Sequence, residues 1–170
     1  MILRPISTVS PNCQNQARAL LESTWNDTTA FDLADKTASF VGLIDTIVVA
    51  VGLVETCRDG LEVTYAIVDS KWRHQRHGTQ LMRAIQSNAG TKSLTLTSDM
   101  HTSQFYTKLG FQCIALAPDG RVCMRWDAQN CSLRRTRALP RGLPRALPRG
   151  LLRALPRGEV GLGERPFGDA

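Results

Sequence analysis

The chain has 170 residues, 42% of them hydrophobic and 21% charged, so it can form one globular domain with a proper core plus an appendage. No apolar run reaches the ~18 residues of a membrane span and the first residues lack a secretory signal pattern, so we expect a cytoplasmic protein. The five cysteines lack the spacing of a zinc module, so we expect no metal site. The net charge of +6 does not belong to the domain, because nine of the 21 Lys and Arg but three of the 15 acids follow Leu133, which leaves residues 1–133 neutral.

Two periodicities alternate along the first part of the chain. Residues 2–6 are a short strand candidate, and Ser10 followed by Pro11 predicts a helix that continues through Thr24. Residues 25–38 are polar and predict a loop or a broken helix. Beyond them, strands are predicted over 39–44, 46–57, 62–68, 93–97, 111–117 and 121–126, and helices over 76–88 and 102–109. This order predicts an α+β fold with a mixed sheet of about seven strands flanked by helices.

A repeat with a period of eight fills residues 137–160 and reads RALPRGLP, RALPRGLL, RALPRGEV. Each proline removes a backbone donor and each glycine adds chain entropy, so we expect a disordered basic tail over 131–170 after a domain at 1–130. The alternative is a docking arm for an acidic partner, RNA or an anionic membrane surface. Nucleic acid is weakly supported, because within residues 131–170 no aromatic side chain for base stacking precedes Phe167.

A basic loop joins the strand that ends at Val68 to the following helix. It contains Arg73, His74, Gln75, Arg76 and His77, followed by Gly78 and Thr79. Positive charge and free amides at a helix N-terminus suit phosphate oxygens, and a glycine lets a ligand approach the backbone. A solvated connection before an amphipathic helix has the same pattern, so the residues alone leave both interpretations open.

Two segments carry a resemblance to a known family. The pattern Val68-x-x-x-x-Arg73-x-x-Arg76-x-Gly78-Thr79-x-Leu81 resembles motif A of the GNAT superfamily of N-acetyltransferases, V-x-x-x-x-[QR]-x-x-G-x-[GA]-[ST]-x-L. The pattern Asp99-x-x-Thr102-x-x-Phe105-Tyr106-x-Lys108-x-Gly110-Phe111 resembles motif B, N-x-x-A-x-x-[LF]-Y-x-K-x-G-F. The matched core spans residues 46–111 and implies a GNAT fold over 1–130. The departures are Arg76 in place of the first glycine and Asp99 in place of asparagine.

The resemblance also implies a co-substrate and its contacts. In the family the loop wraps the pyrophosphate of acetyl-CoA, the preceding strand pairs with the pantetheine, and the strand-end amide, here that of Val68, bonds the acetyl carbonyl. The residues that would bind the cofactor are Ile67, Val68, Arg73, His74, Gln75, Arg76, His77, Gly78, Thr79 and Asp99.

The catalytic roles follow from the same resemblance. Tyr106 would protonate the departing thiolate, since a phenol pKa near ~10 lies within reach of a thiolate near ~8.5. Glu62 coincides with the strand glutamate that histone-type members use as base, and two-residue alternation places it on one face with Thr64 and Ala66. His74, His77, His101 or an ordered water are alternative bases.

The acceptor amine is suggested by a narrower resemblance. The segments 94–112 and 19–26 are similar to the actin-type N-terminal acetyltransferase, which acetylates acidic protein N-termini. This implies a protein or peptide N-terminus as acceptor and a groove that Trp25 could line, although a role as a core anchor is slightly favoured for Trp25. A small-molecule N-acetyltransferase and a GNAT-fold protein that binds coenzyme A weakly without catalysis are the alternatives.

Overall fold

The computed structural model describes residues 1–25 and 29–128, so the tail predicted for 131–170 lies outside the described residues. The strands are β1 (Ile2–Pro5), β2 (Phe40–Ile44), β3 (Ile47–Cys57), β4 (Gly60–Val68), β5 (Leu94–Ser98), β6 (Gln112–Leu116) and β7 (Val122–Trp126). The helices are α1 (Pro11–Trp25), α2 (Thr29–Leu33), α3 (His77–Ala89) and α4 (Met100–Lys108), with short 3-10 turns η1 (Ile6–Thr8) and η2 (Ser70–Trp72). The predicted α+β fold with a seven-stranded mixed sheet is confirmed. Among the described residues, the helices are too short or too polar to cross a membrane.

Local signals fix the ends of the helices. The Ser10 hydroxyl accepts a hydrogen bond from the Cys13 amide at 3.4 Å, which caps α1 as the sequence predicts. Gly90 and Gly110 follow α3 and α4 with φ of 62° and 92°, the left-handed region that ends a helix at least cost in glycine. The segment predicted as a loop or a broken helix contains α2, whose Phe31 is fully buried.

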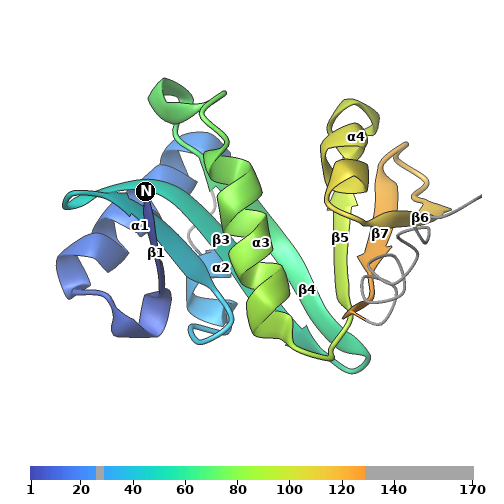
Figure 1. Ribbon diagram of the computed structural model, residues 1–170, viewed down its shortest axis with the longest axis horizontal. Coiled ribbons are helices and arrows are strands. Elements are labelled where there is room, and N and C mark those ends of the chain that lie inside the picture. Colours follow the sequence, from blue (N-terminus) through green and yellow to red (C-terminus); the bar gives the residue numbers. More distant parts are fainter. Residues whose placement is uncertain (26–28, 129–170) are drawn as a thin grey trace, which may run out of the picture. The chain divides into compact units, whose positions relative to one another are not determined.

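The sheet has the order β1-β2-β3-β4-β5-β7-β6, and its one parallel pair in the described residues is β4 with β5. These two strands pair only at Leu61 with Leu94 and at Glu62 with Thr95, close to where both begin. Beyond this point Figure 1 shows them separating, with α3 beside β4 and α4 beyond β5. The backbone therefore opens between the carboxyl ends of two neighbouring strands.

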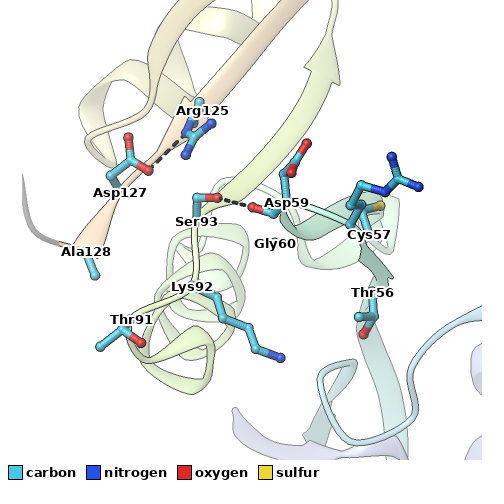
Figure 2. Close-up of a pocket in the computed structure, with 11 residues that line it drawn as sticks. Thr56, Cys57, Asp59, Gly60, Thr91, Lys92, Ser93, Arg125, Asp127 and Ala128 are labelled. Atoms are coloured by element: carbon cyan, nitrogen blue, oxygen red, sulfur yellow. Dashed lines mark hydrogen bonds and ion pairs between the residues drawn. The ribbon is translucent and has the colours of Figure 1, made fainter.

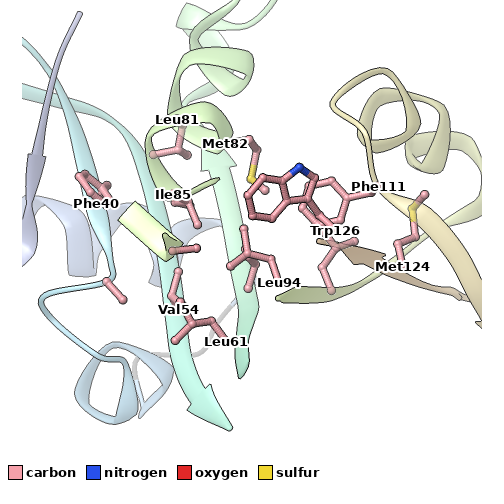
Figure 3. Close-up of a cluster of buried hydrophobic side chains, with 14 of the residues drawn as sticks. Phe40, Val54, Leu61, Leu81, Met82, Ile85, Leu94, Phe111, Met124 and Trp126 are labelled. Atoms are coloured by element: carbon pink, nitrogen blue, oxygen red, sulfur yellow. The ribbon is translucent and has the colours of Figure 1, made fainter. Parts of the chain in front are cut away.

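Two hydrophobic clusters, one on each face of the sheet, hold the helices against it. On one face Leu81 and Ile85 of α3 pack over strand residues such as Leu61, and the cluster continues to Phe111 and Trp126 (Figure 3). On the other face, α1 and α2 pack through residues such as Leu21 and Phe31. The buried side chains thus fix both strands that border the opening.

Candidate active site

Strand β4 carries an irregularity that decides which side chains face the opening. Its register with β3 shifts by one residue, so Thr64 is an extra residue without a partner position. Val63 and Ala66 are three residues apart, yet both pack on the α3 side, whereas Ile67 packs on the α1 side. The predicted shared face of Glu62, Thr64 and Ala66 is therefore wrong, because the bulge reverses the alternation between Glu62 and Ala66.

The loop after β4 is held by its own side chains. The Asp69 carboxylate accepts from the Lys71 amide at 2.9 Å, and Arg73 Nε donates to the Val68 carbonyl at 3.1 Å. His74 and Arg76 have φ of 63° and 64°, so two residues with side chains occupy the left-handed region. The loop thereby turns sharply into α3, which begins at His77.

A hollow of about 640 Å³, here called the α3 hollow, lies between this loop, α3 and α4. The predicted site residues that line it are Val68, Arg73, His74, Arg76, His77, Gly78, Thr79 and Tyr106. Its wall also contains side chains that sequence reasoning did not assign, namely Ala66, Trp72, Leu81, Met82, Thr102 and Phe105. Ile67, Gln75 and Asp99 do not line it. One end of the hollow is therefore basic and the rest is largely apolar.

His77 lies at the first turn of α3 with 8% of its surface exposed. Neither of its ring nitrogens has a hydrogen-bond partner among the described residues. The ring packs near Trp72, with centroids 6.3 Å apart. The imidazole thus lies unsatisfied at a helix N-terminus, and Arg73 and Arg76 line the same hollow. An anionic ligand bound there would supply the missing interactions.

Tyr106 projects from α4 and is fixed by aromatic packing. Its ring meets Phe105 and Phe111 edge to face, with centroids 5.0 and 5.8 Å away. Burial raises the pKa of Tyr106 above its ordinary value, so the hydroxyl keeps its proton at neutral pH. Among the described residues the hydroxyl has no protein hydrogen-bond partner, which leaves it free to donate to a ligand.

A second hollow of about 460 Å³, here called the Trp25 hollow, adjoins the first and shares Ala66, Thr102 and Tyr106 with it. Trp25 lines this hollow, is 58% exposed and packs edge to face on Tyr65 at 5.7 Å. It is therefore not a core anchor. Asp99, at the N-cap of α4, lines the Trp25 hollow as well.

Glu62 lines a third hollow of about 390 Å³, here called the Glu62 hollow, together with Glu55. The residues that it shares with the Trp25 hollow are Val63, Thr64, Tyr65, Thr97 and Arg121, and Tyr106 is not among its lining residues. The structure therefore brings Tyr106 to the meeting point of the α3 and Trp25 hollows, and leaves Glu62 one hollow further away. His101 is exposed and lines none of these three hollows.

A polar hollow at the other end of β4 and β5 contains no predicted site residue. It lies where the turn between β3 and β4 meets the start of β5 and the end of β7 (Figure 2). Its contacts include Ser93 donating to the Asp59 carbonyl at 3.0 Å and an ion pair between Arg125 and Asp127 at 3.0 Å.

Residues 9–120 match the family model of the acetyltransferase (GNAT) domain. The chain belongs to the GNAT acetyltransferase family. Acetyl-CoA, the co-substrate predicted from the two motifs, is the co-substrate of this family, so that prediction is confirmed. No curated protein matches this GNAT chain in sequence.

Solved structures show the same fold at low sequence identity. An aminoglycoside 6'-N-acetyltransferase complexed with coenzyme A is 16% identical with a TM-score of 0.67, covering 75% of this chain and 97% of that one. Ard1 from Thermoplasma volcanium is 20% identical with a TM-score of 0.61, covering 74% and 96%. Arabidopsis thaliana Naa50, in complex with the bisubstrate analogue CoA-Ac-MVNAL, is 13% identical with a TM-score of 0.59, covering 74% and 97%. The acetyltransferases with this fold therefore include enzymes named for small-molecule acceptors and one bound to a peptide-bearing analogue.

Proposed function

We propose that this GNAT protein moves the acetyl group of acetyl-CoA directly to an amine, and that the amine is the N-terminal α-amine of a peptide or protein. The observation that carries the proposal is the position of Tyr106, whose side chain lines both the α3 hollow and the Trp25 hollow. A proton donor at this point can serve a reaction between ligands that enter from the two sides.

The α3 hollow has the chemistry that a phosphate-bearing thioester requires. Arg73, His74 and Arg76 supply positive charge beside the first turn of α3, where free amides and the helix dipole favour phosphate oxygens. The apolar wall suits the pantetheine arm, and the Val68 amide is assigned to the acetyl carbonyl. Ile67 and Gln75 do not line the hollow, so we assign them at most backbone contacts, and we assign Asp99 to the acceptor side.

The reaction is a single transfer. The lone pair of the neutral amine attacks the thioester carbon, and the carbon–sulfur bond breaks as the amide bond forms. The departing sulfur takes the proton of Tyr106, which leaves a phenolate. A base takes the proton that the nitrogen loses, and transfer of one proton from the base back to the phenolate restores both groups. The products are the N-acetylated acceptor and coenzyme A with its thiol. Burial keeps the Tyr106 phenol protonated, which suits the acid role.

The base is assigned to Glu62 acting through water. Glu62 lies in the hollow beyond the acceptor side, and its Oε2 accepts a weak hydrogen bond from Cys57 Sγ at 3.6 Å. Because Glu62 and Tyr106 do not line a common hollow, a water chain has to carry the proton between the amine and the carboxylate. Glu62→Gln should therefore lower turnover, because the water chain then has no carboxylate that takes up the proton lost by the nitrogen.

The acceptor side favours an extended ligand. The Trp25 hollow opens beside an exposed tryptophan and continues into the Glu62 hollow through shared residues. An elongated groove of this kind suits a peptide better than a compact amine. A small-molecule acceptor remains the second candidate, supported by the likeness in fold to the aminoglycoside acetyltransferase.

Two measurements test the proposal in order. Thermal unfolding with and without millimolar acetyl-CoA should show a clear rise in Tm, and no rise would refute the enzyme function altogether. Coenzyme A release is then followed with an N-terminal peptide library and, in parallel, with polyamines and aminoglycosides. Turnover on peptides alone supports the N-terminal acceptor, whereas turnover on the small amines alone refutes it. Tyr106→Phe should reduce turnover by roughly 10²-fold or more while coenzyme A still raises Tm.

A further inference from the structure

Two parts of the domain border the α3 hollow, here called the β1–α3 part and the β5–β7 part after the elements that each contains. Their backbones are joined at one end of the sheet, where the Leu61 amide donates to the Ser93 carbonyl at 2.9 Å. The Ser93 hydroxyl also donates to the Asp59 carbonyl at 3.0 Å (Figure 2). Beyond this end β4 and β5 no longer pair, so contacts between α3 and α4 decide how the two parts stand across the hollow.

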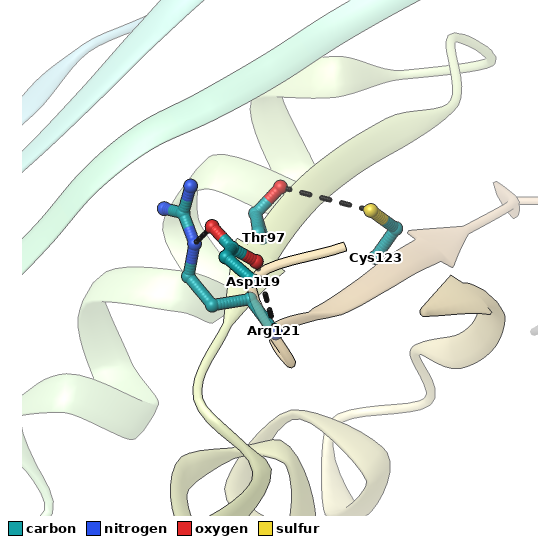
Figure 4. Close-up of polar contacts among 4 residues, drawn as sticks. All are labelled: Thr97, Asp119, Arg121 and Cys123. Carbon is teal, nitrogen blue, oxygen red and sulfur yellow. Dashed lines mark hydrogen bonds and ion pairs between the residues drawn. The ribbon is translucent and has the colours of Figure 1, made fainter. Parts of the chain in front are cut away.

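Most contacts of the β5–β7 part leave its position along α3 open. Arg121 Nε donates to Asp119 Oδ2 at 2.6 Å, and the Thr97 hydroxyl lies 4.0 Å from Cys123 Sγ, so the polar contacts in Figure 4 stay inside the β5–β7 part. The apolar cluster in Figure 3 does connect the two parts. Apolar contacts are not directional, so they hold the parts together without fixing how α4 is placed along α3.

Gln86 makes a directional contact between the two parts. Its Nε2 donates to the Leu109 carbonyl at 2.9 Å, and both residues are half-buried. A carbonyl can only accept, so the amide nitrogen of Gln86 has to face it. Among the described residues, this is the one side-chain hydrogen bond from α3 to the β5–β7 part. Gln86 belongs to neither of the two sequence motifs.

The bond lies one helical turn beyond the α3 hollow on both helices. On α3, Gln86 follows Met82 by four residues, and Met82 lines the hollow. At the end of α4, Leu109 follows Phe105 by four residues, and Phe105 lines the hollow as well. The Leu109 amide donates to the Tyr106 carbonyl at 2.9 Å. Leu109 is thus tied to α3 through its carbonyl and to Tyr106 through its amide.

We propose that Gln86 is a positioning residue that sets the place of Tyr106 against the thioester in the α3 hollow. The inference rests on the proposed function, in which Tyr106 gives its proton to the departing sulfur. A shift of about 1 Å in a reacting group can cost roughly 10²-fold in rate. The cofactor phosphates are assigned to the loop and the first turn of α3, more than one turn away from Gln86, so their binding should not depend on this bond.

The test measures coenzyme A release by the full-length protein with acetyl-CoA varied. The acceptor is the member of the peptide, polyamine and aminoglycoside panel that the unaltered protein acetylates fastest. Gln86→Met keeps the length of the side chain and removes the donor, so kcat should fall roughly tenfold or more while KM for acetyl-CoA stays within about twofold. Gln86→Glu keeps the shape without a donor when ionised and should show the same loss. Gln86→Lys restores a donor beside a helix C-terminus, which favours positive charge, and should recover most of kcat.

A double variant shows whether Gln86 acts through the Tyr106 hydroxyl. If it does, Gln86→Met should lower kcat by less than about twofold when Tyr106→Phe is already present, because the group that the bond positions is gone. A general weakening of the fold would instead lower kcat by the same factor with and without Tyr106→Phe.

Asn88→Leu is the matched control. Asn88 also lies on α3, and its Nδ2 also donates to a backbone carbonyl, that of Thr37 at 3.3 Å, but Thr37 belongs to the β1–α3 part. Its replacement should leave kcat within about twofold. The rise in Tm with coenzyme A, measured for every variant, shows that each one is folded and binds the cofactor.

Each other outcome overturns a defined part. An unchanged kcat in Gln86→Met and Gln86→Glu, an equal loss in Asn88→Leu, a loss confined to KM, or an equal loss in the presence of Tyr106→Phe refutes the positioning role. Full turnover by Tyr106→Phe alone refutes the acid assignment in the proposed function, and the inference with it. No turnover on any amine, with coenzyme A still raising Tm, refutes the proposed reaction itself and therefore any role of Gln86 in it.

Discussion

Replacing Arg76 with glycine should stabilise this protein. Arg76 precedes α3 with φ of 64° and ψ of 9°, and its side chain makes no capping hydrogen bond. A residue with a Cβ costs about 1–2 kcal/mol in this left-handed region. Glycine removes that cost but gives the unfolded chain more entropy, which takes back about 0.5–1 kcal/mol. The net gain of roughly 0.5–1 kcal/mol corresponds to a rise in Tm of a few degrees for a domain of this size.

Scanning calorimetry of three variants checks this reasoning. His74→Gly should act like Arg76→Gly, since His74 has φ of 63°. Gln75→Gly is the matched control, because Gln75 lies between them, is exposed and does not have a positive φ, so it should lower Tm. A fall in Tm for Arg76→Gly as large as that for Gln75→Gly would refute the argument. Titration with coenzyme A separates a second role: a higher Tm with weaker binding would mean that the Arg76 side chain meets a phosphate.

Gly52→Ala should cost about 1–3 kcal/mol of unfolding free energy, because the added Cβ would lie 2.7 Å from Ile85 of α3. Gly78→Ala is the control and should cost nothing, because the nearest atom to its added Cβ is 3.6 Å away. Equal denaturation midpoints for the two variants would contradict this. Burial raises the pKa of Tyr106, so the contribution of this group to stability is complete below the unfolded pKa of 10.0 and is lost as the pH rises through the higher folded pKa. When Tm is measured against pH, Tyr106→Phe should lack this alkaline loss of stability, and an unchanged loss would point to other groups. The hydrogen bond from the Thr37 hydroxyl is the main cause of the lowered pKa of Asp35. The contribution of Asp35 to stability is therefore present above the ordinary pKa of 3.8 and is lost as the pH falls through the folded pKa. Asp35→Asn should flatten the acid limb of the curve of Tm against pH, and an unaltered limb would exclude Asp35 as its cause.

Most of the fold could be predicted from the sequence, because local residue signals mark the ends of its helices. Ser10 and Pro11 begin α1, and glycines follow α3 and α4, so the predicted helices agree with the structure within about two residues. The short helix α2 could not be assigned with certainty. A helix of five residues is too short to be stable by itself, and burial of Phe31 against the sheet holds it in place.

The site could be predicted only where one segment carries its own pattern. The loop from Arg73 to Thr79 and the aromatic pair at Tyr106 are contiguous motifs, and both line the α3 hollow. Arg121 belongs to no such motif and reaches the groove through strand pairing between residues far apart in the chain. Asp99 fits its motif by spacing, yet its side chain lines the acceptor side, since sequence spacing does not specify which hollow a helix cap faces.

The bulge at Thr64 shows how much one unpredictable residue contributes to the site. With strict alternation from Val63, the next two side chains on the α3 side would be those of Tyr65 and Ile67, both large. The extra residue turns Ala66 to that side instead, and Ala66 lines both the α3 hollow and the Trp25 hollow, as Tyr106 does. Tyr65 is thereby released to pack against Trp25 on the acceptor side. A single insertion in one strand therefore exchanges a large side chain for a small one where the two hollows meet, and adds Tyr65 to Trp25 and Tyr106 in the aromatic lining of the Trp25 hollow.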